Sequence, residues 1–117
     1  MVKEGEGKDK LRIEMEKLMD TDKSSPEQIL FLTVILQALL DATKPEQKQE
    51  SVEAKLARDS AKAWFAASIG VTAEDFSIVC DLAGINSEYT KSFAYKVIKS
   101  KEIEYVRKRI NTVLSFK

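Results

Sequence analysis

Apolar residues recur at spacings of three and four along most of the 117-residue chain, and this pattern predicts helices. Two prolines and four glycines leave long segments without a helix breaker. We therefore expect an all-α protein, a bundle of five to six helices that forms a single domain over residues 10–117. Residues 1–9 hold only Val2 as an apolar residue after Met1, and we expect them to form a disordered arm.

The most apolar helix is predicted from Pro26 to about Ala42. Ser25 can cap its free amides, Pro26 lacks an amide that would go unbonded, and Glu27 complements the helix dipole. Residues 29–40 are apolar nearly all round, so several sides of this helix have to be covered. It is either the central core helix or a helix with one side against another subunit, and the two interpretations are compatible.

Two amphipathic helices are predicted beside it. The first covers residues 10–20, with an apolar stripe of Leu11, Met15, Leu18 and Met19. The second begins after Lys44, where Pro45 and Glu46 can open a helix, and runs to about Ala67. Its predicted buried residues are Val52, Leu56, Ala57, Ala61, Trp64 and Phe65. Its predicted outward residues are Glu46, Lys48, Glu50, Lys55, Arg58 and Lys62.

Two further helices are predicted to be joined by a tight turn. The first covers residues 73–83, and Gly84 can close it in the left-handed conformation. The second begins at Asn86 or Ser87, both good capping residues, and runs to about Lys99. A last helix is predicted over about residues 101–115. Its inward residues are Ile103, Val106, Ile110, Val113 and Leu114.

The residues around the turn have predicted packing roles. Val79 and Ala83 face the partner helix, Cys80 is small enough to let the two helices cross closely, and Ile85 fills the space under the turn. The inward stripe predicted for the second helix is Tyr89, Phe93 and Val97.

The segment from Phe76 to Val97 resembles the helix-turn-helix of DNA-binding proteins. Together with the Ala-Lys-Ala-Trp-Phe run at residues 61–65, residues 57–99 resemble small phage-encoded helix-turn-helix proteins. These include small terminase subunits, which recognise viral DNA for packaging, and phage transcription regulators. The resemblance implies a non-enzymatic, oligomeric DNA binder in the host cytoplasm, and it does not choose between packaging and transcription. Thr90 departs from the pattern, since the family usually has an aliphatic residue there.

The polar residues that project from the second helix and the basic residues of the last helix are the predicted DNA contacts. Lysine and serine reach phosphates and base edges, and lysine can donate to guanine. Residues 87–117 hold eight basic and three acidic residues, a net charge of +5, whereas residues 1–86 hold eleven basic and sixteen acidic residues, a net charge of −5. One basic end is the polarity expected of a protein that meets a polyanion with one face. The predicted contacts are Ser87, Lys91, Ser92, Tyr95, Lys96, Lys99, Arg107, Lys108 and Arg109.

Composition excludes several other chemistries. Without histidine the chain has no imidazole base or ligand, and one cysteine and four scattered glycines build neither a zinc site nor a phosphate-binding loop. We expect no enzyme, no cofactor, no metal and no small-molecule substrate. The longest apolar block spans 12 residues, whereas a membrane span needs about 20, so we expect no membrane segment and a cytoplasmic protein.

Two alternatives to DNA binding remain. The polar face of the second helix can be merely solvated, as in an ordinary corner of two helices. The chain can also be a protein–protein adaptor, in which the apolar helix over residues 26–42 docks on a partner and the basic end is incidental.

Overall fold

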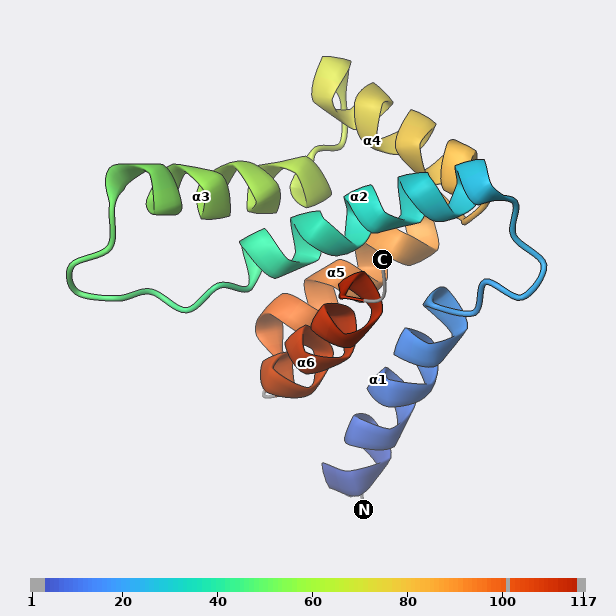
Figure 1. Ribbon diagram of the computed structural model, residues 1–117. Coiled ribbons are helices and arrows are strands. Elements are labelled where there is room, and N and C mark those ends of the chain that lie inside the picture. Colours follow the sequence, from blue (N-terminus) through green and yellow to red (C-terminus); the bar gives the residue numbers. More distant parts are fainter. Residues whose placement is uncertain (1–3, 101, 116–117) are drawn as a thin grey trace.

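The computed structural model describes the backbone of residues 4–100 and 102–115. Within these residues the chain forms six helices and no strand, which confirms the predicted all-α fold (Figure 1). The helices are α1 (Glu4–Leu18), α2 (Pro26–Ala42), α3 (Val52–Ala66), α4 (Gly70–Ala83), α5 (Ser87–Lys99) and α6 (Ile103–Leu114).

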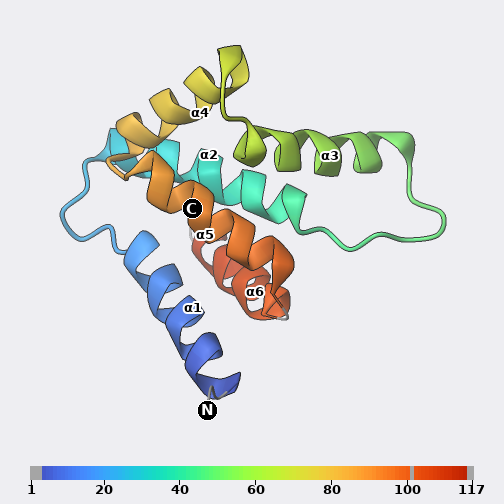
Figure 2. The ribbon, with the colours of Figure 1, turned by 180° about the vertical axis from the view of Figure 1, so that it is seen from behind.

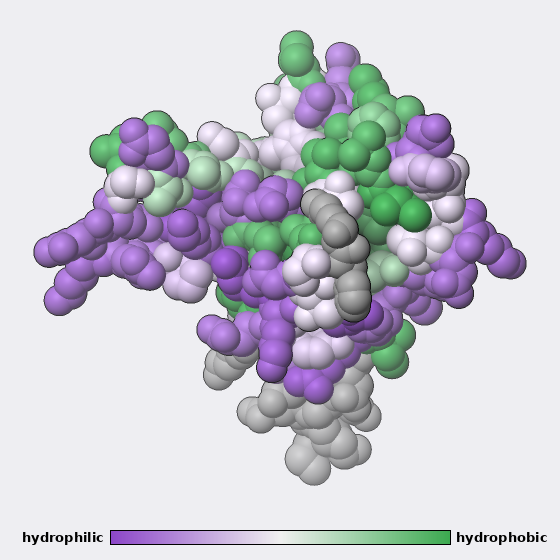
Figure 3. All heavy atoms as spheres, viewed as in Figure 1, coloured by the Kyte–Doolittle hydropathy of each residue, from purple (hydrophilic) through white to green (hydrophobic). Residues whose placement is uncertain are grey.

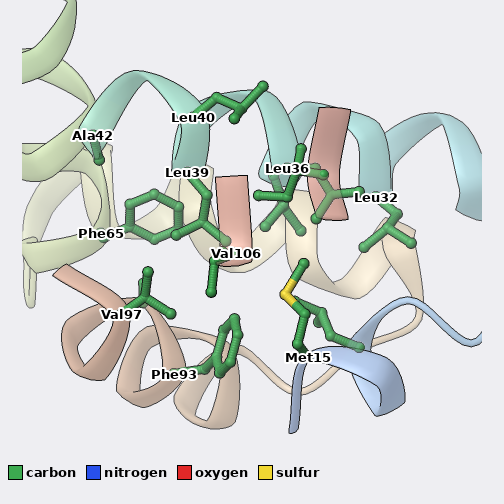
Figure 4. Close-up of a cluster of buried hydrophobic side chains, with 14 of the residues drawn as sticks. Met15, Leu32, Leu36, Leu39, Leu40, Ala42, Phe65, Phe93, Val97 and Val106 are labelled. Carbon is green, nitrogen blue, oxygen red and sulfur yellow. The ribbon is translucent and has the colours of Figure 1, made fainter. Parts of the chain in front are cut away.

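Helix α2 is the centre of the bundle, as the pattern predicts, and α3, α4 and α6 pack against it. Its start is fixed by a capping box: the Ser25 side chain accepts a hydrogen bond from the Gln28 amide at 3.1 Å, and the Gln28 side chain accepts one from the Ser25 amide at 2.9 Å. Figure 4 shows its inner side chains meeting Met15 of α1, Phe93 of α5 and Val106 of α6. The residues of α2 with no exposed surface are Ile35, Leu36 and Leu39.

The starts of two helices differ from the prediction. Helix α1 begins at Glu4, although the arm was predicted to continue to residue 9; residues 1–3 of that arm lie outside the described residues. Helix α4 begins at Gly70 rather than Ala73, because Gly70 adopts a φ of +90° that lets the chain turn directly into the helix.

Helix α3 starts later than predicted and turns a different face inward. Its cap is Ser51, whose side chain accepts a hydrogen bond from the Ala54 amide at 3.1 Å, so the prediction of a start at Pro45 was wrong. Arg58, predicted to face outward, is 3% exposed, and its guanidinium makes a two-pronged ion pair with the Glu50 carboxylate. Predicted core residues of its first half are exposed instead: Val52, Leu56 and Ala57.

The reason for this difference lies in the length of α2. The first half of α3 extends beyond the end of α2, with the connecting segment looping outside it, as Figure 1 shows. Val52 and Leu56, in that half, therefore have no opposing helix to bury them, whereas Ala61 and Phe65, in the second half, are buried as predicted.

Candidate nucleic-acid interface

The turn between α4 and α5 is short and is closed by three hydrogen bonds. Gly84 takes a left-handed φ of +78°, and its amide donates to the Asp81 carbonyl at 3.0 Å. The Ile85 amide donates to the Cys80 carbonyl, also at 3.0 Å, and the Asn86 side chain caps α5 by accepting from the Tyr89 amide at 2.7 Å. The glycine turn and the asparagine cap thus have the geometry that the sequence predicts.

The inward face of α5 is rotated relative to the predicted stripe. Phe93 and Val97 are buried, but the third inward position is Thr90, with no exposed surface, while Tyr89 is 37% exposed. The Thr90 hydroxyl donates to the Asn86 carbonyl at 2.8 Å, so a polar side chain is satisfied inside the core. Thr90 therefore fills the position at which the resembling family has an aliphatic residue, and the prediction for Tyr89 was wrong.

Cys80 of α4 completes this crossing. The side chain is fully buried, as its predicted role in close helix packing requires. Burial raises the pKa of the Cys80 thiol to about 11, and hydrogen bonding with the neighbouring Thr90 offsets part of that rise. The thiol stays protonated at neutral pH and acts as a packing residue.

The outer face of α5 is polar and unobstructed. In Figure 2 the helix crosses the middle of the molecule between α1 and α3, with no other helix in front of it. Tyr95 is 65% exposed, and the Lys99 ammonium lies 5.5 Å from the centroid of its ring. Ser92 is also exposed, whereas Ser87 is half-buried at the start of the helix.

A groove of about 480 Å³ runs between α3 and this face, and we call it the α3–α5 groove. It brings together three of the predicted contacts with a lysine of α3 that the sequence reasoning missed. The lining residues are Lys62, Phe65, Ala66, Glu88, Lys91, Ser92, Tyr95 and Ile98. Lys62 was predicted to face outward, but no local signal placed it beside α5, because that proximity depends on how α3 docks.

Two lysines of α5 already have partners within the molecule. The Lys91 ammonium donates to the Ala67 carbonyl at the end of α3, where the negative end of the helix dipole favours a cation. The Lys96 ammonium lies 3.3 Å from the Glu14 carboxylate of α1. The partner of Lys91 is an uncharged carbonyl, whereas the partner of Lys96 is a carboxylate.

The predicted contacts on α6 do not join the α5 face. Arg107 donates to the Leu40 carbonyl and, at 3.0 Å, to the Thr43 hydroxyl, so it closes the C-terminal end of α2. In Figure 1 α6 lies in front of α5, and in Figure 2 it lies behind α5, so the exposed side of α6 is not the outer face of α5. Lys108 is exposed, but on the α6 side.

Arg109 forms a partly exposed ion pair with α1. Its guanidinium contacts both oxygens of the Glu16 carboxylate, at 2.6 and 2.9 Å, and Tyr105 donates to one of them at 3.3 Å. The hydrogen bonds from Arg109 lower the pKa of Glu16. Helix α1 thus brings carboxylates to the basic end of the chain and neutralises part of the +5 charge counted along the sequence.

Other kinds of site have little support in the described residues. No three or more side chains of the metal-binding types gather there. No single described helix has the length and apolar character to cross a membrane, and α3 and α4 meet those criteria only as a pair bent by 80°. The chain matches no protein-family model, no curated protein and no solved structure.

Proposed function

We propose that this protein binds duplex DNA without catalysing a reaction, and that it presents the outer face of α5 to the major groove. The observation that carries the proposal is the exposed polar face of α5, held at a fixed angle by the glycine turn from α4 (Figure 2). The major groove of B-DNA is wide enough to admit an α-helix, and its base edges offer acceptors to lysine and serine.

The proposed contacts divide into two groups. Ser92 and Tyr95 lie along the middle of the outer face and would contact base edges. Lys62, Lys91 and Lys99 flank them and would contact phosphates. Glu88 of the same groove repels phosphate but can accept from the amino group of cytosine.

Four residues leave the contact set that the sequence predicts. Ser87 is half-buried at the start of α5, and Arg109 is paired with Glu16. Arg107 and Lys108 line a pocket formed by residues of α6 rather than the α3–α5 groove. Lys96 stays at the edge of the set, because phosphate would compete with Glu14 for its ammonium.

The resemblance to small phage-encoded helix-turn-helix proteins favours a role in DNA packaging or in transcription control, as an oligomer in the host cytoplasm. A mass measurement in solution separates the two roles. A ring of many subunits would favour packaging, and a dimer would favour a regulator on a two-fold operator.

The test is fluorescence anisotropy with a labelled random-sequence duplex, on the wild type and two variants with equal charge changes. Ser92→Glu/Lys99→Glu alters the α5 face, and Lys48→Glu/Gln49→Glu alters the exposed loop between α2 and α3. We expect the α5 variant to lose at least about tenfold in affinity and the loop variant less than about twofold, since binding loss follows local contacts. Equal losses would refute the assignment to α5.

Salt dependence gives a second readout. Three lysines on phosphates predict a slope of about −2.7 in log affinity against log salt, or about a 40-fold loss between roughly 50 and 200 mM salt. Absence of binding at the lower concentration would refute DNA binding and leave the adaptor as the function.

A further inference from the structure

A second groove, of about 570 Å³, runs between α2, α3 and α4, and we call it the α2–α3–α4 groove. It shares no lining residue with the α3–α5 groove. Alanines form part of its lining, and larger apolar side chains flank them. These lining residues are Ala38, Ala57, Ala61, Phe31, Trp64 and Val79.

Exposed apolar side chains extend this surface over α2 and α4. Leu30 and Val34 of α2 are 60% and 44% exposed, and Ile78 and Leu82 of α4 are 56% and 46% exposed. Figure 3 shows apolar residues gathered over these two helices. The four residues expose on the order of 400 Å² of surface, which is within the range of about 300–600 Å² of the largest, often functional, apolar patches on monomeric proteins.

The charge of the same two helices has one sign. Helices α2 and α4 contain five acidic residues and no lysine or arginine: Glu27, Asp41, Glu74, Asp75 and Asp81. Asp41 and Asp75 line the groove itself. One oxygen of each accepts a hydrogen bond, from Gln37 at 3.3 Å and from Trp64 at 2.8 Å, and neither carboxylate takes part in an ion pair between described residues.

We propose that this face binds an amphipathic helix of another protein, one with lysine or arginine beside its apolar stripe. A helix in a groove anchors itself by apolar side chains spaced three and four apart, and the alanines of the α2–α3–α4 groove leave room for such anchors. Asp41 and Asp75 then pair with the flanking cations of the partner.

Charge decides between this partner and a second copy of the chain. A two-fold contact through this face would bring Asp41 and Asp75 of one copy against the same carboxylates of the other, whereas a basic helix complements them. The same carboxylates repel DNA, so this site is distinct from the one proposed on α5.

The first experiment uses a fluorescein-labelled 18-residue Leu/Lys amphipathic helix, and a Leu/Glu helix of the same pattern as its control. Ala57→Trp fills the groove from an exposed position of α3, and Ala63→Trp adds the same bulk at an exposed position outside the lining residues. We expect the Leu/Lys helix to bind, and Ala57→Trp to weaken it by about tenfold, or about 1.4 kcal/mol, while Ala63→Trp leaves it unchanged. Equal binding by the two variants, or equal binding of the Leu/Glu helix, would overturn the proposal.

If circular dichroism shows that Ala57→Trp disturbs the fold, a variant that changes only a charge tests the proposal instead. Asp41→Asn is expected to weaken the Leu/Lys helix by about two- to fivefold and to lower the salt dependence, relative to Asp59→Asn on the exposed side of α3. No difference between these variants would overturn the role of the carboxylates. Sedimentation velocity tests whether the face binds a second copy of the chain. Self-association that Ala57→Trp abolishes would assign the face to that second copy and refute the proposal of a helix from another protein.

Discussion

Replacing Gly84 with alanine is expected to destabilise the protein by about 2–3 kcal/mol, through two separable effects. The first is conformational: Gly84 has a φ of +78°, and the left-handed region costs a residue with a side chain about 1–2 kcal/mol. The second is steric. An added Cβ would lie 2.6 Å from Nε2 of Gln28, so that side chain has to move.

The movement of Gln28 has its own cost because this side chain is half of the capping box of α2. Its Oε1 accepts the Ser25 amide at 2.9 Å, and loss of such a cap costs about 1 kcal/mol. The steric effect therefore exists only while Gln28 is present. Gly84→Ala in a Gln28→Ala background is expected to cost only the conformational 1–2 kcal/mol, that is, about 1 kcal/mol less than in the wild type.

Urea unfolding followed by circular dichroism at about 222 nm measures all four proteins of this cycle. Gly70→Ala is the matched control, because Gly70 has a φ of +90° and an added Cβ there meets nothing within 4 Å. Gly70→Ala is expected to destabilise the protein only by the conformational effect. A Gly84→Ala cost that is unchanged in the Gln28→Ala background, or no larger than that of Gly70→Ala, would refute the reasoning.

Two charge predictions concern the ion pairs. Glu14→Gln removes the partner of Lys96 and is expected to raise duplex affinity about two- to fivefold in the anisotropy assay. The control is Glu53→Gln, at an exposed position of α3, which is expected to leave the affinity unchanged. Equal affinities of the two variants would contradict this prediction. Arg109 lowers the pKa of Glu16, and Arg58 lowers the pKa of Glu50, below the ordinary value of 4.5. As the pH falls, the unfolded chain therefore takes up protons on these carboxylates before the folded protein does. The free energy of unfolding decreases as the pH falls from about 4.5 through the lowered pKa values. Urea midpoints between about pH 5 and pH 3 are expected to fall more steeply for the wild type than for Glu16→Gln/Glu50→Gln, and parallel curves would show that these pairs do not contribute.

The helices that the sequence predicts well are those whose ends depend on near neighbours. Ser25 with Gln28, Gly84 and Asn86 each act within four residues, so their spacing alone determines the cap. The inward face of α3 could not be predicted in this way. Arg58 is buried because Glu50, eight residues earlier and outside the helix, folds back to meet it.

In the candidate interface, too, the features set by near neighbours could be predicted and those set by distant contacts could not. Periodicity along α5 placed Ser92 and Tyr95 on the outer face, because those positions follow from the helix itself. Which cations are available to a ligand depends on contacts between distant parts of the chain. Lys96 meets a carboxylate 82 residues earlier in the sequence, and Arg107 bonds to a carbonyl 67 residues earlier, so counting charges along the chain overstated the basic surface.

Three packed aromatic rings lie between the two proposed binding faces. Phe65 lines the α3–α5 groove and Trp64 lines the α2–α3–α4 groove, although the two residues are adjacent in sequence. Their centroids lie 5.3 Å apart, and Phe76 of α4 packs edge-to-face against both, at 5.0 and 5.7 Å. A close-packed aromatic cluster does not compress, so any tilt of α3 that narrows one groove has to move the floor of the other. A helical partner that tilts α3 is therefore expected to displace these rings and change the affinity of the α5 face for DNA.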